Sequence, residues 1–217
     1  MRLAELSERS GVPIATIKYY LREGLLAPGR QINARTAEYD EEHLRRLRLV
    51  RAMIQVGRVP VATVRDVLGH VDDDSLPRTI RMGAALWALP QVPEPDEEDE
   101  YVRSAHEVAD QLLESLGWSN AQALVTISPS YRSLVVAMAA LRRLCYDWDP
   151  QLLLAYARLM HGAAALDLDF VETHGSEAEK VEAAVLGAVL VEPMLQALHR
   201  LAQEEESARR YGFGEQE

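Results

Sequence analysis

Two short helical patterns joined by a tight turn open this chain, and they constrain its fold more than any other stretch. Leu3 and Leu6 fall on one side of a first helix. Ile14, Ile17 and Leu21 recur at three- and four-residue steps in a second. These apolar faces predict two helices packed against each other, with the outer side of the second left exposed.

The turn and the outer surface of the second helix indicate what the pair is for. Gly11 supplies the positive φ that a sharp exit from a helix requires, and Pro13 suits the opening of the next one. The residues left facing outward are Ala15, Thr16, Lys18, Tyr19 and Arg22. A small, polar, cationic and aromatic helix surface is accepted by a DNA major groove. The stretch therefore predicts a helix-turn-helix, although a plain small helical domain can contain such a pair.

The residues that follow carry a family resemblance from about Leu3 to Leu68. The matching segments are Ile17-Lys18-Tyr19-Tyr20, Glu23-Gly24-Leu25-Leu26, Pro28, Tyr39 and Glu41-Glu42-His43-Leu44-Arg45-Arg46-Leu47. Together they resemble the MerR family of bacterial transcription regulators. The resemblance implies a β-hairpin wing after the second helix that grips the phosphate backbone, and a second wing at the turn 57–60. The turn dipeptide Pro28-Gly29 and two short extended arms agree with a hairpin.

The expected DNA contacts combine this resemblance with the exposed surface. We expect Thr16, Lys18 and Tyr19 at the groove, and Arg30, Arg35, Tyr39 and Arg58 on phosphates. The family usually has Arg where this chain has Lys18, and Lys lacks the bidentate fork of Arg. The family also favours Tyr-Arg where this chain has Thr36 and Ala37, so operator preference is expected to differ. Tyr20 is expected in the core.

The charge distribution favours a DNA-binding front end. The 217 residues carry a net charge of −11, but residues 1–70 contain 12 of the 23 Lys and Arg and only 8 of the 34 Asp and Glu. A basic head on an acidic body is typical of a protein that binds phosphate with one end. The acidic body should repel DNA elsewhere and so orient the encounter.

The rest of the chain is expected to be helical. We expect a mainly α fold: a winged helix-turn-helix in residues 1–70, a linker with dimerisation helices in 71–118, and an all-α bundle in 119–217. Pro90, Pro93 and Pro95 with the acidic residues that follow interrupt the middle part at 90–100. Pro193 is expected to kink or split the last helical stretch.

The dimer seam stays open at this stage. By resemblance, one long helix after the DNA-binding domain pairs antiparallel with its copy. Here that helix is broken by the prolines, leaving 76–89 and a second helix to about Leu116 with Tyr101, Ala105, Val108 and Leu112 at heptad-like steps. Either or both are candidates for the interface of a homodimer.

The second half offers candidates for an effector pocket and none for catalysis. Tyr131, Tyr146, Trp148 and Tyr156 have flat apolar faces with one polar handle, which suit an organic molecule, cationic or apolar in the acidic surround. Core packing is the competing interpretation for each. Cys145 is expected within a helix and in the core. We expect no metal site, no cofactor and no enzyme activity, because histidines lack ligand spacing and no phosphate loop or nucleophile motif is present.

The sequence thus predicts a cytoplasmic transcription regulator that binds double-stranded DNA as a homodimer on a palindromic promoter operator. RNA polymerase is implied as a partner by the resemblance alone. A small organic effector in the helical part is the favoured modulator, and a protein partner of that part with no small ligand is the alternative. No run approaches the about 20 apolar residues of a membrane span, and neither a signal peptide nor an internal disulfide is expected, since the chain has a single cysteine.

Overall fold

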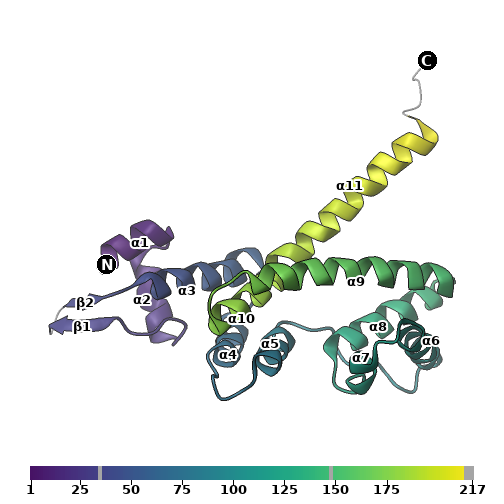
Figure 1. The fold of residues 1–217 in the computed structure, drawn as a ribbon, viewed down its shortest axis with the longest axis horizontal. Coiled ribbons are helices and arrows are strands. Elements are labelled where there is room, and N and C mark those ends of the chain that lie inside the picture. The colour runs from purple at the N-terminus through teal and green to yellow at the C-terminus, as the bar shows by residue number, and fades with distance from the viewer. Residues whose placement is uncertain (34–35, 147–148, 213–217) are drawn as a thin grey trace. The chain divides into compact units, whose positions relative to one another are not determined.

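The computed structural model describes residues 1–33, 36–146 and 149–212 (Figure 1). They form two compact units, Met1–Leu86 with His174–Glu217, and Trp87–Thr173. The described residues are mostly helical, with one two-stranded antiparallel sheet. This confirms the mainly α fold with an N-terminal winged helix-turn-helix. The division at residues 70 and 118 concerns functional roles and stays a prediction.

The first unit begins with the expected helix pair, α1 (Leu3–Ser10) and α2 (Ile14–Arg22). Gly11 ends α1 with φ 65°, which confirms the predicted left-handed turn. Leu6 and Ile17 are fully buried where the two helices meet, and Tyr20 is buried as expected. Ile14, expected on the same face, is instead 39% exposed because it is the first helical residue and lies at the edge of the contact.

The hairpin wing consists of β1 (Arg30–Asn33) and β2 (Thr36–Glu38), paired antiparallel with Arg30 opposite Glu38. The Pro28-Gly29 pair precedes β1 and is not the hairpin turn. The next helix, α3 (Glu41–Arg51), begins at the predicted cap Asp40, whose carboxylate accepts the N–H of His43 at 3.1 Å. His43 returns the contact with Nδ1 3.3 Å from Asp40 N, so the two form a capping box.

We expect Asp40→Ala to destabilise the protein by about 1 kcal/mol, because the first turn of α3 loses its acceptor. The hydrogen bond to His43 holds the pKa of the Asp40 carboxyl below its ordinary value. A lowered pKa gives stability that is present above the ordinary value of 3.8 and lost as the pH falls through the lowered one. Thermal unfolding at pH 7 and pH 3 measures this effect. The loss of melting temperature caused by Asp40→Ala should be smaller at pH 3 than at pH 7. An equal loss at both pH values would contradict the capping role of Asp40.

After α3 the chain continues through a π-helical stretch, η1 (Ala52–Val56), then α4 (Val61–Val71) and α5 (Arg78–Trp87). Gly57 ends the first run. Val64, Val67 and Leu68 of α4 are buried on one face of the helix. The turn 57–60 thus lies between η1, which buries Met53, and the buried face of α4.

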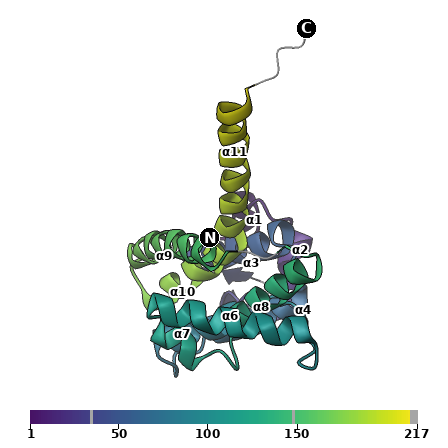
Figure 2. The same cartoon turned by 90° about the vertical axis from the view of Figure 1, so that its right-hand side faces the viewer.

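The second unit contains α6 (Glu100–Leu116), α7 (Ser119–Ala123), α8 (Pro129–Arg143) and α9 (Pro150–Glu172). Helices α6 and α8 lie side by side (Figure 2). Their contact is a core of small and apolar residues: Val102, Ala105, Ala109, Leu113, Tyr131, Val135 and Ala139. Of the seam residues predicted on α6, Ala105 belongs to this core, whereas Tyr101 is 38% exposed.

One expectation about this unit is wrong. Cys145 was expected within a helix and in the core, but α8 ends at Arg143 and Cys145 is exposed with φ 59°. The reason is a tightened last turn, in which the N–H groups of Leu144 and Cys145 bond to carbonyls three residues back and the chain leaves the helix.

The last helical stretch returns to the first unit as α10 (Glu177–Leu186), a π-helical stretch η2 (Gly187–Val191) and α11 (Glu192–Tyr211). Ser176 and Glu179 form a capping box at the start of α10. Pro193 was expected to kink or split the stretch, and the π-helical stretch η2 separates α10 from α11 immediately before it.

This stretch, Glu177–Tyr211, is long and apolar enough to cross a membrane by length and composition, with a mean hydropathy of 1.6 over 18 residues. The sequence prediction that no run approaches the length of a membrane span concerned uninterrupted apolar residues only. Length and composition are weak evidence, since helices that pack against protein pass the same test. In α10, Val181, Ala183 and Val185 are buried within the first unit.

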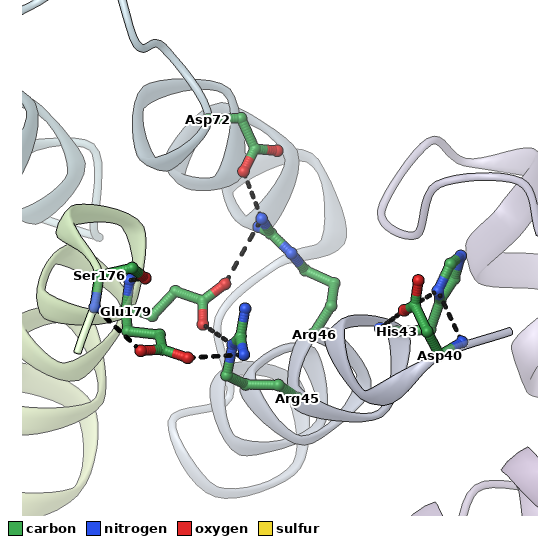
Figure 3. A network of polar contacts seen from close by, with 8 residues as sticks. Asp40, His43, Arg45, Arg46, Asp72, Ser176 and Glu179 are labelled. Atoms are coloured by element: carbon green, nitrogen blue, oxygen red, sulfur yellow. Dashed lines mark hydrogen bonds and ion pairs between the residues drawn. The ribbon is translucent and has the colours of Figure 1, made fainter. Parts of the chain in front are cut away.

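An ion-pair network joins α10 to α3 (Figure 3). Arg45 donates to Glu179 at 2.8 Å and to Glu182 at 3.1 Å. Arg46 pairs with Asp72 and lies 3.5 Å from Glu182. These two arginines of α3 hold the C-terminal stretch against the N-terminal helices of the same unit.

Candidate nucleic-acid interface

The outer face of α2 carries the predicted groove residues. Ile17 and Tyr20 are buried on the inner side, which turns Lys18 fully outward and leaves Thr16 and Tyr19 half-buried beside it. The three side chains therefore lie on the outer side of α2, here called the exposed strip, in which Lys18 is exposed and Thr16 and Tyr19 are partly exposed. Such a strip presents a hydroxyl, an ammonium and a phenol, which hydrogen-bond to base edges or phosphates.

Arg22 belongs to the same surface and was not included in the predicted contact set. Its guanidinium carbon lies 5.9 Å from the centre of the Tyr19 ring. The spacing of three residues on a helix puts the two side chains on one face, so the sequence contained this signal. Arg22 is exposed and adds a second cation near Lys18.

Arg65 holds the end of α2 in place and was also missed. Its Nε donates to the Glu23 carbonyl at 2.9 Å and its Nη2 to the Glu23 carboxylate at 2.6 Å. This bidentate contact from α4 fixes the point at which the chain leaves α2 toward the wing. Nothing in the local sequence pattern pairs residues 42 positions apart.

The predicted phosphate-binding residues of the wing differ in their exposure. Arg30 is exposed and paired with Glu38 across the hairpin, so part of its charge is neutralised there. Tyr39 is only 7% exposed, with its ring edge-on to His43 at 5.2 Å. Its position gives Tyr39 a packing role, and a phosphate contact from it stays a prediction. Arg35 lies outside the described residues.

The second turn presents Arg58 to solvent. Arg58 has φ 53° and is exposed, and it has no hydrogen-bond or ion-pair partner among the described residues. The turn is closed by N–H bonds from Gly57 to Ala52 O and from Val59 to Met53 O, both 2.9 Å. A Cβ on Gly57 would meet Val189 at 2.6 Å and the Met53 carbonyl at 3.0 Å. The turn therefore packs closely on η2, and only glycine fits there.

The N-terminus is tied to the wing, which keeps α1 and the hairpin together. The terminal ammonium donates to the Tyr39 carbonyl at 2.6 Å, and the Tyr39 N–H donates to the Met1 carbonyl at 2.8 Å. Arg9 makes a two-pronged contact with Glu41 at 2.5 and 2.9 Å. These contacts join the first helix, the wing and α3 into one body that carries the exposed strip of α2.

The three predicted effector residues that the structure describes, Tyr131, Tyr146 and Tyr156, are not brought together. Tyr131 belongs to the core of the second unit, where its hydroxyl donates to Asp110 at 2.6 Å and lies 3.0 Å from His106 Nδ1. Tyr146 borders a cavity beside α8 that does not include Tyr156. Trp148 lies outside the described residues. Among the residues that the structure describes, no group of three or more His, Cys, Asp or Glu could hold a metal ion.

Comparison with known proteins agrees with this geometry. Residues 1–70 match the model of the MerR HTH family regulatory proteins. A solved structure, that of the proposed transcriptional regulator SCO5550 from Streptomyces coelicolor A3(2), is 67% identical, with 98% of this chain and 99% of that chain covered and a TM-score of 0.85. The HTH-type transcriptional regulator ZntR homolog of Haemophilus influenzae is 34% identical over 50 residues.

The second of these matches is partial, since it covers 23% of this chain and 37% of the relative. The S. coelicolor structure, by contrast, covers nearly the whole chain. Both relatives point to regulation of transcription and not to an enzyme. The chain belongs to the MerR family of helix-turn-helix transcription regulators.

Proposed function

We propose that the protein binds a palindromic promoter operator as a homodimer, with α2 in the major groove and the two wings on the phosphate backbone. The observation that supports this most is the exposed strip of α2, Thr16, Lys18, Tyr19 and Arg22, on a helix whose opposite face is buried. A rigid recognition helix is what base readout requires, because bases are read by side chains held in register.

The dimer is proposed to form through α11. This helix has no buried residue, although Met194, Leu198 and Leu201 lie on one side at three- and four-residue steps and Leu190 of η2 continues the stripe. A helix in a protein owes most of its stability to the packing of its apolar face. A second copy of α11 covers the stripe, and because η2 packs on the Arg58 turn, this contact also fixes the spacing of the two DNA-binding heads.

The second unit is proposed to bind a small organic effector that alters the affinity of the protein for DNA, and thereby the access of RNA polymerase to the promoter. The protein is proposed to act in the cytoplasm. The acidic stretch 94–100 and the exposed apolar residues of α9 keep a protein partner as the second candidate for this unit. A partner would bind without any small molecule, so the two are separable.

The experiment is a footprint of the full-length protein on the DNA flanking its own gene, with and without extract of the cells that make it. Protection of two half-sites about one helical turn apart is the expected result. A change in the protected region with extract passed through a small-pore membrane supports the effector, and a change only with the retained macromolecules supports the protein partner. Absence of protection at low salt would refute DNA binding.

Arg58→Gln should weaken binding to operator and to unrelated DNA alike. One lost phosphate contact lowers the slope of log affinity against log salt by about 1. Fluorescence anisotropy from 50 to 300 mM salt measures both quantities. Arg58→Lys should keep the slope, and Arg103→Gln, which removes the same charge from the second unit, should leave binding unchanged. A change in which sequence is preferred would show that Arg58 reads bases.

A further inference from the structure

A cavity of about 520 Å³ opens beside α8 in the second unit. Helix α8 supplies most of its wall, with Leu134, Met138 and Leu141 at four- and three-residue steps. Val108 of α6 and Leu153 of α9 also line it. The volume lies within the range of drug-sized ligand sites, which are lined mostly by apolar side chains, as this cavity is.

The core of the second unit holds this wall in place. Leu134 and Met138 line the cavity and also pack against the buried cluster between α6 and α8. Because the cluster supports them from behind, these side chains have little freedom to collapse into the space. Water in such an apolar cavity finds few hydrogen-bond partners, so an apolar molecule that replaces it is favoured.

The polar side chains of the lining, Arg142 and Tyr146, provide no counter-ion for a charged ligand. Arg142 already interacts with another group of the protein, so its charge and its donors do not select the ligand. Tyr146 carries a neutral phenol, and no Asp or Glu of the described residues lines the cavity. A charged ligand would therefore lose its hydration here without compensation, which is costly. Of the two effector classes that the acidic composition allowed, cationic and apolar, the lining favours the apolar one.

We infer that this cavity binds an uncharged, largely apolar organic molecule, whose hydrocarbon or aromatic body lies against Leu134, Met138 and Leu153. The phenol of Tyr146 offers such a molecule one hydrogen bond, as donor or as acceptor. The inference rests on the proposed function, since it names the class of the effector. It can fail alone: a protein that binds its operator but no neutral apolar molecule retains its role as a DNA-binding regulator and loses only this ligand.

The test uses the full-length protein and N-phenyl-1-naphthylamine, an uncharged apolar dye that fluoresces when it leaves water. Decanol, decanoate and decyltrimethylammonium compete against it, since they match in chain length and differ in charge. Ala137→Trp places a bulky ring in the cavity, and Ala140→Trp puts the same ring on α8 outside the lining. Leu153→Gln places an amide in the wall on α9, with Leu152→Gln beside it as the control outside the lining. Circular dichroism melts show which variants are folded.

We expect saturable binding of one dye per chain, with decanol displacing it at a concentration about tenfold or more below that of either ion. Ala137→Trp should abolish binding and Leu153→Gln should weaken it about tenfold, whereas both controls should bind as the unchanged protein does. If Ala137→Trp does not fold, Leu153→Gln decides.

Absence of dye binding, or binding that the folded cavity variants leave unchanged, would overturn the site. Displacement by either ion as readily as by decanol would overturn the uncharged class of ligand. Operator binding without any dye, measured in parallel, tests the proposed function separately.

Discussion

Replacing Leu198 and Leu201 by glutamate should convert the protein from dimers to monomers and lower its affinity for a two-half-site operator about 100-fold or more. The two leucines are 52% and 58% exposed in the middle of the α11 stripe. Two like charges in the centre of a helix pair cannot be desolvated without a large penalty. Each head then binds its half-site alone, so the gain in effective concentration that the dimer provides is lost.

Light scattering on a sizing column and anisotropy with whole and half operators measure the two effects. Affinity for a single half-site should stay unchanged, because α2 and the wings are not touched. The matched control is Leu159→Glu with Leu166→Glu on α9, whose leucines are 66% and 71% exposed at heptad spacing. If that pair dissociates the dimer and the α11 pair does not, the seam lies on α9 and the proposed interface is wrong.

The N-terminal part of the fold could be predicted from sequence because its determinants are local. Gly11 permits one backbone conformation that other residues avoid, and Asp40 and Ser176 begin helices through bonds to residues three positions on. Such signals act within a few residues and survive in a single sequence. The prolines at 90, 93 and 95 ended a helix for the same reason.

The placement of the C-terminal stretch could not be predicted, because its contacts join residues far apart in the chain. Arg45 meets Glu179 across 134 residues, and no local sequence pattern marks the pair. A run of arginines on a helix has the same sequence pattern whether it faces water or buried carboxylates. The π-helical stretches η1 and η2 have no established sequence signature, yet they bring Gly57 and Val189 into contact.

The residues of the candidate site also fall into those that local sequence signals could place and those that they could not. Exposure of Lys18 followed from helix periodicity, since its neighbours Ile17 and Tyr20 had to face the core. Burial of Tyr39 did not follow, because a three-residue strand gives too short a pattern to show which face is inside. In the second unit the sequence predicted an effector pocket lined by aromatic residues, but the cavity is lined mainly by leucine, methionine and valine from three helices.

Glu182→Ala should lower the free energy of unfolding of the first unit by about 3 kcal/mol, because it breaks a buried ion-pair network. The Glu182 side chain is 6% exposed and lies between Arg45 and Arg46. Arg46 keeps Asp72 as a partner, which holds the loss below that of a fully orphaned charge. Chemical unfolding followed by circular dichroism measures the change. Glu177→Ala, which removes an exposed carboxylate from the same helix, should cost less than about 1 kcal/mol.

Measuring the stability of Glu182 variants against pH distinguishes the contribution of the carboxylate charge from that of side-chain packing. Burial raises the pKa of the Glu182 carboxyl despite the two arginines, so protonating it costs less in the folded protein than in the unfolded chain. A raised pKa gives stability that is present below the ordinary value of 4.5 and declines as the pH rises through the raised one. Glu182→Gln keeps the size and shape of the side chain but cannot titrate. This variant should lose this part of the pH dependence of the free energy of unfolding, and it should retain more stability than Glu182→Ala. Equal stability of the Ala and Gln variants across this range would mean that the network does not hold α10 on α3, and that the apolar contacts of Val181 and Val185 do so alone.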